Sequence, residues 1–311
     1  MSILITGGTG MLGTALVKLA GQLGIHVLAP NRSELNLENS SQTLDYIDRT
    51  KPTAIIHTAA KVGGIAANVA NPIEFLTQNI EIDRNLLKAA ELFKIEKLIY
   101  VGSSCMYPMN LTTPMSEKQI LSGPLEPTNE GYALAKLVGA KNVQYVAETK
   151  GFAWRNLVLS NLYGPHDHFE PDRSHLLAAI IGKVGSAADT KSRKILMWGD
   201  GSVRREFTFV EDVASFMLTS INHLSKYPNL LNVGIGVDYS VREYYEMVIK
   251  AFNLDIEIVN DLSKPIGFQR KLLDVTEARK LGWNPQVDIE LGIRRTIDWY
   301  LLKSKVNLLN E

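Results

Sequence analysis

The sequence predicts an α/β fold in which a parallel sheet lies between two layers of helices. An apolar strand at residues 3–5 runs into a glycine-rich loop, and a helical pattern follows at residues 12–23. Apolar strand patterns then alternate with helical patterns as far as residue 159, and this order is typical of a doubly wound sheet. After about residue 165 the alternation fades, so we expect a smaller C-terminal α/β substrate domain to follow a Rossmann-type sheet.

The bulk composition favours a globular protein that acts on small molecules. The chain has 311 residues, of which 45% are hydrophobic, so it can bury a substantial core. Basic and acidic residues number 33 each, which indicates neither nucleic acid nor a membrane as a partner. The single cysteine, Cys105, excludes an internal disulfide. Because we also find no signal peptide and no apolar run of bilayer length, we expect a cytoplasmic protein.

The sheet is expected to contain strands at residues 3–5, 26–29, 54–57, 97–101 and 151–159, and residues 231–234 return to it. We therefore predict an NADP-binding domain over residues 1–165, with a returning segment near 206–236. Residues 166–205 and 237–311 would form the substrate-binding domain. His57, at the end of a strand, is expected to be a core histidine with its polar groups satisfied. A metal site at His166, Asp167 and His168 is not expected, because their spacing does not fit one helical face.

The glycine-rich loop is the first candidate binding element. It satisfies G-x-G-x-x-G from Gly8 and G-x-x-G-x-x-G from Gly7. Between a strand and a helix, such glycines allow a tight turn and a close approach to a pyrophosphate, which the helix N-terminus binds. The alternative is a strand-to-helix turn without a ligand. The predicted cofactor contacts in this loop are Gly7, Gly8, Thr9, Gly10, Met11, Leu12 and Gly13.

The end of the second strand indicates which dinucleotide is bound. NAD enzymes usually carry an acid there, which binds the ribose 2′-hydroxyl. This chain has Pro30, Asn31 and Arg32 instead, and arginine suits a 2′-phosphate. We therefore predict NADP as the cofactor, with a solvated surface arginine as the alternative.

A candidate catalytic group combines Ser103 with Tyr132 and Lys136. Tyr132 and Lys136 stand at i and i+4, so a helix places them on one face. A lysine ammonium beside a phenol lowers the pKa of the tyrosine, which can then serve as a general acid or base. Ser103 ends a predicted strand, and its hydroxyl can bond a carbonyl oxygen held next to Tyr132. The alternative is a chance pair on a helix near a core cysteine.

These residues together resemble the extended short-chain dehydrogenase/reductases. The resemblance narrows to the GDP-L-fucose synthase family over residues 59–65, 102–108, 125–130, 161–167 and 270–274. That family epimerises C3 and C5 of GDP-4-keto-6-deoxy-D-mannose and then reduces C4 with NADPH. The resemblance implies a homodimer, because residues 72–93 and 132–149 are similar to the helices of a four-helix interface.

The resemblance implies a role for each candidate residue. Inverting a carbon next to a ketone needs a base on one face and an acid on the other. Cys105 resembles the base and His175 the acid, with an inert thiol and a surface histidine as the alternatives. Tyr132 resembles the proton donor to the C4 oxygen, Lys136 the residue that tunes it and holds the nicotinamide ribose, and Ser103 a hydrogen-bond partner of that oxygen.

The resemblance also implies further contacts with both ligands. A GDP-sugar would be held by cations at its diphosphate and by an aromatic face at its guanine or sugar. The implied substrate contacts are Asn129, Asn161, Lys183, Trp198 and Arg205. The further implied cofactor contacts are Ala59, Lys136, Leu159, Ser160, Asn161, Leu162 and His175. The alternatives are a core aromatic for Trp198 and a solvated surface for the two cations.

The chain also departs from the family. Ile266 stands where an acid is usual, Phe268 and Gln269 replace a Thr-Pro pair, His168 replaces an asparagine, and residues 159–160 replace Pro-Thr. These changes leave open a related GDP-keto sugar, such as a deoxyheptose or dideoxyhexose.

Three other functions remain as alternatives. A 4,6-dehydratase would carry an acid after Ser103, where this chain has Ser104 and Cys105. A pure 4-epimerase would not need the pair of Cys105 and His175. A non-catalytic NADP-binding module often lacks the tyrosine or the lysine, and this chain keeps both.

Overall fold

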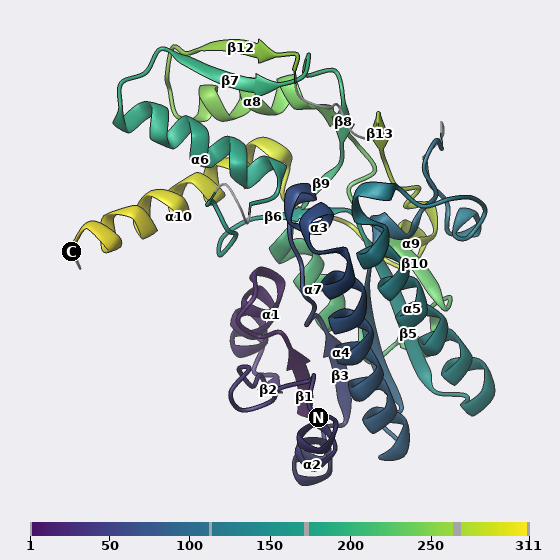
Figure 1. Ribbon diagram of the computed structural model, residues 1–311. Coiled ribbons are helices and arrows are strands. Elements are labelled where there is room, and N and C mark those ends of the chain that lie inside the picture. Colours follow the sequence, from purple (N-terminus) through teal and green to yellow (C-terminus); the bar gives the residue numbers. More distant parts are fainter. Residues whose placement is uncertain (1, 112–113, 171–173, 264–268, 310–311) are drawn as a thin grey trace.

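The structure is a computed structural model that describes residues 2–111, 114–170, 174–263 and 269–309. It has a lower part, built on a parallel sheet with helices on both faces, and an upper part that holds α6, α8, α10, β7 and β12 (Figure 1). The predicted α/β fold class, a doubly wound parallel sheet, is confirmed.

The main sheet has six strands in the order β10-β5-β4-β3-β1-β2, and every neighbouring pair is parallel. In chain order the strands are β1 (Ser2–Thr6), β2 (His26–Leu28), β3 (Ala54–His57), β4 (Lys97–Ser103), β5 (Ala153–Leu159) and β10 (Leu230–Val233). The central strands are nearly continuous apolar runs, because helices cover both of their faces. The expected return of residues 231–234 to this sheet is confirmed by the pairing of β10 with β5.

Helices cover the two faces of the main sheet. On one face α4 packs against both α2 and α5, and on the other α1 packs against α7 (Figure 1). These helices are α1 (Met11–Gln22), α2 (Ser40–Thr50), α4 (Pro72–Leu92), α5 (Glu130–Lys150) and α7 (Val210–Ser220). The carboxyl ends of parallel strands share one edge, so β1, β3, β4 and β5 deliver the residues that follow them to the same place.

The upper part is built around a second cluster of buried apolar side chains, which includes Tyr163, Phe207 and Tyr244. Its elements are α6 (Leu176–Asp189), β7 (Lys194–Trp198), α8 (Val241–Ala251), β12 (Glu257–Asp261) and α10 (Ile289–Leu309). Two small sheets accompany it, one of β6 (Asn161–Tyr163) and β9 (Phe207–Phe209), the other of β11 (Tyr239–Ser240), β8 (Arg204–Arg205) and β13 (Arg270–Lys271). A short helix, α9 (Thr276–Lys280), follows β13 in the chain.

The structure differs from the expected elements in two places. Residues 65–70 form a short helix, α3 (Ile65–Ala70), where no element was predicted. β4 reaches Ser103, so this residue belongs to the strand itself. Ile266 and Phe268 lie outside the described residues. Within the described ranges, no helix combines the length and apolar character needed to cross a bilayer.

Candidate active site

The glycine-rich loop between β1 and α1 has the geometry of a dinucleotide cradle. Gly7 has φ +70°, and a Cβ there would lie 2.8 Å from the backbone nitrogen of Ala59. A Cβ on Gly13 would lie 2.1 Å from the carbonyl oxygen of Gly7, so the helix can approach the loop only without that side chain. Thr9 and Gly10 are exposed at the start of α1, where no side chain caps the helix. The free backbone amides of this turn therefore fit a pyrophosphate.

Residues around the loop complete the predicted cofactor surface. The backbone N–H of Ala59 donates to Thr6 Oγ1 over 3.4 Å, next to Gly7. Arg32 is largely exposed, and its guanidinium lies 2.6 Å from Glu38. The predicted cofactor contacts at the end of β5 differ in burial: Leu159 and Ser160 are buried, whereas Asn161 and Leu162 are half-buried.

Ser103 and Tyr132 meet at the carboxyl end of β4. β4 carries Ser103 on its last residue, and α5 begins with Glu130, two residues before Tyr132. Ser103 lies close enough to Tyr132 for side-chain hydrogen bonding to influence the pKa of the phenol, and the Ser103 hydroxyl accepts from the backbone N–H of Cys105 over 3.2 Å. The two residues that resemble a carbonyl-binding pair therefore share one place.

Cys105 lies in the same group. It sits in a single turn of 3₁₀ helix, Ser104–Met106, that directly follows β4, and Asn129 Nδ2 donates to its sulfur over 3.3 Å. Arg205 faces this turn from β8: burial lowers the pKa of its guanidinium to about 10, while Glu126 and the charge of an ionised Cys105 raise it. Predicted site residues from three separate stretches of the chain thus come together: Ser103 and Cys105, Asn129 and Tyr132, and Arg205.

The expectation that Lys136 lowers the pKa of Tyr132 is wrong. Burial raises the pKa of Tyr132 well above its usual value, and the negative charges of Cys105 and Asp83 raise it further. The hydrogen bond with Ser103 acts in the opposite direction but is weaker. Lys136 instead lies 3.9 Å from Asp83, and it is not among the groups that shift the pKa of Tyr132. Tyr132 therefore carries its proton at neutral pH, which suits a proton donor.

Lys136 is buried in a polar network that the sequence did not indicate. Its ammonium lies near one oxygen of Asp83 and 4.5 Å from the centre of the Tyr100 ring. His57 is fully buried, as expected of a satisfied core histidine, and it bonds both Thr6 and Asp83. Asp83 and Tyr100 were missed because an acid in a helix and a tyrosine in an apolar strand have no distinctive spacing.

His175 is placed apart from the group around Cys105. It caps the N-terminus of α6 with its backbone, and its side chain is exposed. Although its surface is exposed, the many neighbouring atoms of the chain desolvate the imidazole and, with the charge of His168, lower its pKa, so the imidazole is neutral at pH 7. Among the described contacts none joins His175 to Cys105.

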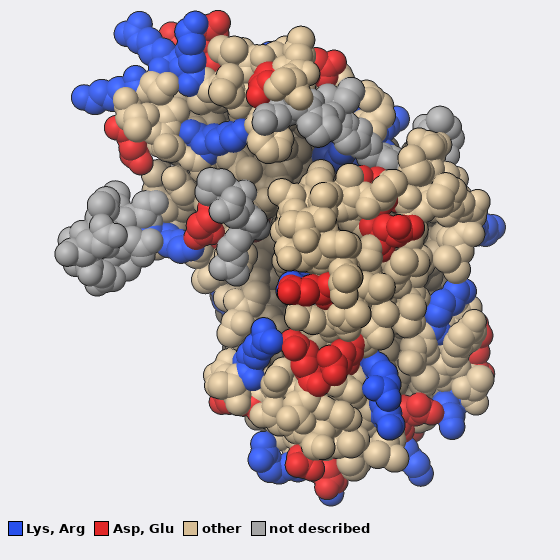
Figure 2. Space-filling model, in the orientation of Figure 1, with Lys and Arg blue, Asp and Glu red and all other residues tan. Residues whose placement is uncertain are grey.

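Lys183 and Trp198 lie together in the upper part. The Lys183 ammonium is 5.5 Å from the centre of the Trp198 ring and 3.3 Å from the carbonyl oxygen of Leu196. Trp198 ends β7 with 60% of its surface exposed, so the alternative of a core aromatic is excluded. On the face shown in Figure 2, Lys and Arg are scattered among Asp and Glu, apart from a basic group at the upper left.

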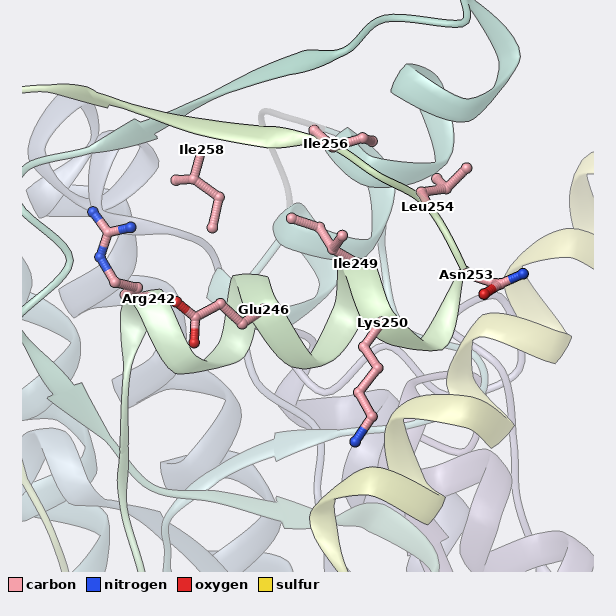
Figure 3. Close-up of a pocket in the computed structure, with 8 residues that line it drawn as sticks. All are labelled: Arg242, Glu246, Ile249, Lys250, Asn253, Leu254, Ile256 and Ile258. Carbon is pink, nitrogen blue, oxygen red and sulfur yellow. The ribbon is translucent and has the colours of Figure 1, made fainter.

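A separate surface pocket lies between α8 and β12 (Figure 3). Its apolar lining comes from Ile249, Leu254, Ile256 and Ile258, and Arg242, Glu246 and Lys250 stand around it. None of the predicted site residues lines this pocket, so its position is unrelated to the group around Cys105.

Comparison with known proteins identifies the class. Residues 3–234 match the model of the NAD dependent epimerase/dehydratase family, and the chain belongs to this family. Membership accounts for the cradle between β1 and α1, since these enzymes bind a nicotinamide cofactor.

Within that family the similarity is specific. The chain is 42% identical to a GDP-L-fucose synthase of Azorhizobium caulinodans, over 98% of this chain and 97% of that protein. It is 41% identical to a GDP-L-colitose synthase of Yersinia pseudotuberculosis, over 97% and 98%. Among solved structures, a GDP-mannoheptose C4 reductase from Campylobacter jejuni with NADP bound superimposes with a TM-score of 0.88 at 29% identity, covering 96% of this chain and 98% of that one.

Proposed function

We propose that this protein is an NADPH-dependent epimerase/reductase that epimerises C3 and C5 of a GDP-4-keto-6-deoxy sugar and reduces C4. The observation that carries the proposal is the grouping of Ser103 and a protonated Tyr132 with Cys105, whose sulfur accepts a hydrogen bond from Asn129. This grouping supports a proton donor and a candidate base that act on the same part of the sugar. The names of the relatives at 42% and 41% identity support a GDP-linked sugar as the substrate.

In the reductive step the cofactor would supply a hydride to C4. The loop of Gly7 and Gly10 and the buried Lys136 would hold it, and the NADP-bound C4 reductase supports NADPH in particular. Ser103 would donate a hydrogen bond to the C4 oxygen, and Tyr132 would give that oxygen its proton. Because Tyr132 is protonated at neutral pH, it can donate this proton to the C4 oxygen.

In the epimerisation step Cys105 would remove the proton from the carbon next to the ketone. The C–H bond breaks, its electron pair moves onto the C4 oxygen as an enolate, and an acid on the opposite face returns a proton to the carbon. The amide of Asn129 donates to the sulfur and would stabilise the thiolate. His175 is the proposed acid, and because its imidazole is neutral at pH 7 it would have to take up a proton before it returns one to the carbon.

Binding of the GDP group would use the exposed pair in the upper part. The Trp198 ring is accessible for stacking on guanine, and the Lys183 ammonium beside it would contact the diphosphate. Arg205, next to Cys105, would reach the phosphate or the sugar from the lower end, and Asn161 would contact the sugar. The amide of Asn161 donates to the carbonyl oxygen of Glu206, which fixes it beside Arg205.

A second candidate is reduction, with or without epimerisation, of another GDP-keto sugar. The relative at 41% identity is a GDP-L-colitose synthase, and the C4 reductase with a TM-score of 0.88 is named for a mannoheptose. A deoxyheptose or a dideoxyhexose is therefore the substrate class to compare.

We also propose a homodimer that acts in the cytoplasm. Leu134, Val138 and Tyr145 are 40%, 53% and 59% exposed along one side of α5, and Ile73 on α4 is 75% exposed. An apolar stripe of this kind on two long helices fits a two-fold interface. Val138→Glu would place a charge in the stripe and should give a monomer mass by light scattering, whereas a dimer mass for this variant would contradict the interface.

The substrate test uses the purified protein with NADPH and a panel of GDP- and dTDP-linked 4-keto sugars. We expect NADPH oxidation with a GDP-4-keto-6-deoxy sugar, together with uptake of solvent deuterium at C3 and C5. Oxidation without deuterium uptake would favour the reductase alternative. No turnover of any sugar, with NADPH binding intact, would favour a non-catalytic module.

A further inference from the structure

We propose that Asp83 is a positioning residue for Lys136, held by His57 and Tyr100, and that it links the cofactor loop to the reductive end of the site. The proposal rests on the proposed function in one respect, that Lys136 contacts the cofactor. Asp83 lies in the middle of α4 and is 2% exposed, and Lys136 lies on α5 and is also 2% exposed. The helices that carry them pack directly together.

Every polar contact of the Asp83 carboxylate comes from a different element. His57 Nε2, on β3, lies 3.0 Å from Oδ1, and the Tyr100 hydroxyl, on β4, donates to Oδ2. The Lys136 ammonium, on α5, lies 3.9 Å from Oδ1. Tyr132 is the other titratable group whose charge Asp83 influences. The carboxylate is therefore fixed from three sides, and Lys136 is held against a fixed charge.

The direction of the hydrogen bonds follows from chemistry. Burial lowers the pKa of His57, so its ring is neutral and carries one proton. Burial alone would raise the pKa of Asp83, but the charge of Lys136 and the hydrogen bonds from His57 and Tyr100 together lower it. An ionised carboxylate can only accept, so His57 donates from Nε2 and accepts at Nδ1. The Thr6 hydroxyl, 2.7 Å from Nδ1, must then be the donor. It in turn accepts from the backbone N–H of Ala59, next to Gly7.

All of these donors point the same way, from the cofactor loop towards Asp83. Thr6 precedes Gly7, and Ala59 packs on Gly7. The series of hydrogen bonds therefore begins beside the glycine-rich loop, with the bond from Ala59 to Thr6. It ends at Lys136, one helical turn from Tyr132. A buried carboxylate with both oxygens occupied is costly to desolvate and is stable only when paired, which explains why three donors converge on it.

Close packing leaves this network little freedom. A Cβ on Gly139 of α5 would lie 2.3 Å from the Tyr100 hydroxyl and 2.7 Å from Asp83 Oδ2, so only glycine lets α5 come this near. The position of the Lys136 ammonium is therefore set by the packing of α4 and β4 against α5, in addition to its own side-chain rotamer.

The test is Asp83→Asn, which keeps the shape of the side chain and removes its charge. The burial that disfavours the Lys136 ammonium would remain, and the carboxylate that favours it would be lost, so the pKa of Lys136 should fall. Lys136 would then lose its proton at a lower pH. NADPH affinity, measured by fluorescence titration from pH 6 to 10, should begin to fall about one pH unit or more below the wild-type transition.

Turnover should respond in the same direction. Loss of the Asp83 charge also removes one of the influences that raise the pKa of Tyr132, so the alkaline fall of kcat should move to lower pH. Unchanged pH profiles for both NADPH affinity and kcat would overturn the proposal. A wild-type protein that binds NADPH but turns over no sugar would refute the proposed function alone, and the affinity profile would still decide the role of Asp83.

Two further variants separate positioning from folding. Asn85→Ala, also on α4, removes a buried amide that donates to the Leu37 carbonyl oxygen, so it should lower the melting temperature without moving either pH profile. Tyr100→Phe removes only the hydroxyl that donates to Asp83 and should shift both profiles in the same direction by a smaller amount. If Asp83→Asn does not fold, a shift in Tyr100→Phe supports the proposal, and the absence of one overturns it.

Discussion

The two ends of the candidate site are built in opposite ways. At the end of β4, Ser103 and Cys105 are hydrogen-bonded, Asn129 donates to the Cys105 sulfur, Tyr132 is buried next to them, and Lys136 is fully enclosed. In the upper part, Trp198 is 60% exposed and Lys183 contacts it across 5.5 Å. The first region is fixed by several elements at once, whereas the second presents accessible side chains.

This difference matches the function proposed for each region, which is proton and hydride transfer at the end of β4 and nucleotide binding in the upper part. Proton and hydride transfer depend on distance and on pKa, both of which a buried and bonded environment controls. Recognition of a nucleotide requires that the ligand reach the aromatic face, and that face must therefore remain open until the ligand binds. Variants at the buried end should change kcat, and variants at the exposed end should change KM.

The largest effect is expected at Tyr132. Tyr132→Phe removes the proposed proton donor, and general acids contribute about a hundredfold to ten-thousandfold, so NADPH oxidation should fall by that range. Exchange of solvent deuterium into C3 or C5 should continue, because Cys105 is unchanged. Tyr145→Phe, on the exposed side of the same helix, is the matched control and should retain activity. A Tyr132→Phe variant with wild-type NADPH oxidation would remove Tyr132 from the mechanism.

Cys105→Ser should impair epimerisation while leaving reduction possible. A hydroxyl is a much weaker acid than a thiol, so its conjugate base is scarce at neutral pH and proton exchange at C3 and C5 should fall about a hundredfold or more. Slow hydride transfer to the unepimerised ketone should remain and shift the product towards the non-inverted sugar, as measured by NMR. Wild-type exchange rates in this variant would show that Cys105 is an inert thiol.

Trp198→Ala tests the exposed end. Loss of stacking is worth about 1 kcal/mol, so KM for the GDP-sugar should rise by about fivefold to tenfold with little change in kcat. Leu196→Ala is the matched control, because Leu196 is exposed at 57% on the same strand. A fall in kcat with unchanged KM would contradict the division between the two ends.

The smallest effect is expected at Arg32, which is exposed and already paired with Glu38. Arg32→Ala should raise KM for NADPH by only a few-fold and leave NADH nearly unchanged, because surface charge pairs are worth at most about 1 kcal/mol. Arg49→Ala, on α2, controls for the loss of a surface cation. Equal affinity of the wild type for NADPH and NADH would refute the preference for NADP.

Local patterns in the chain were sufficient for the fold and for part of the site. The strand before Gly7, the helix after it and the apolar runs of β3 and β4 each follow from residue periodicity, which acts over a few neighbours. Tyr132 and Lys136 could be paired because one helix fixes their spacing. Ser103 could be placed near them because the carboxyl ends of parallel strands meet at one edge.

Only the tertiary structure decided what surrounds these residues. Asp83, His57 and Tyr100 come from α4, β3 and β4 and meet at Lys136, and nothing in their local sequence marks them as partners. The pKa of Tyr132 depends on the same assembly: a neighbouring lysine in the helix predicted a lower pKa, whereas burial and the charge of Asp83 raise it. The sequence by itself determined which groups are available for chemistry, because residue types and local spacing are written in it. Their protonation and orientation were decided by packing between distant elements, because desolvation and charge pairing depend on all neighbours in space.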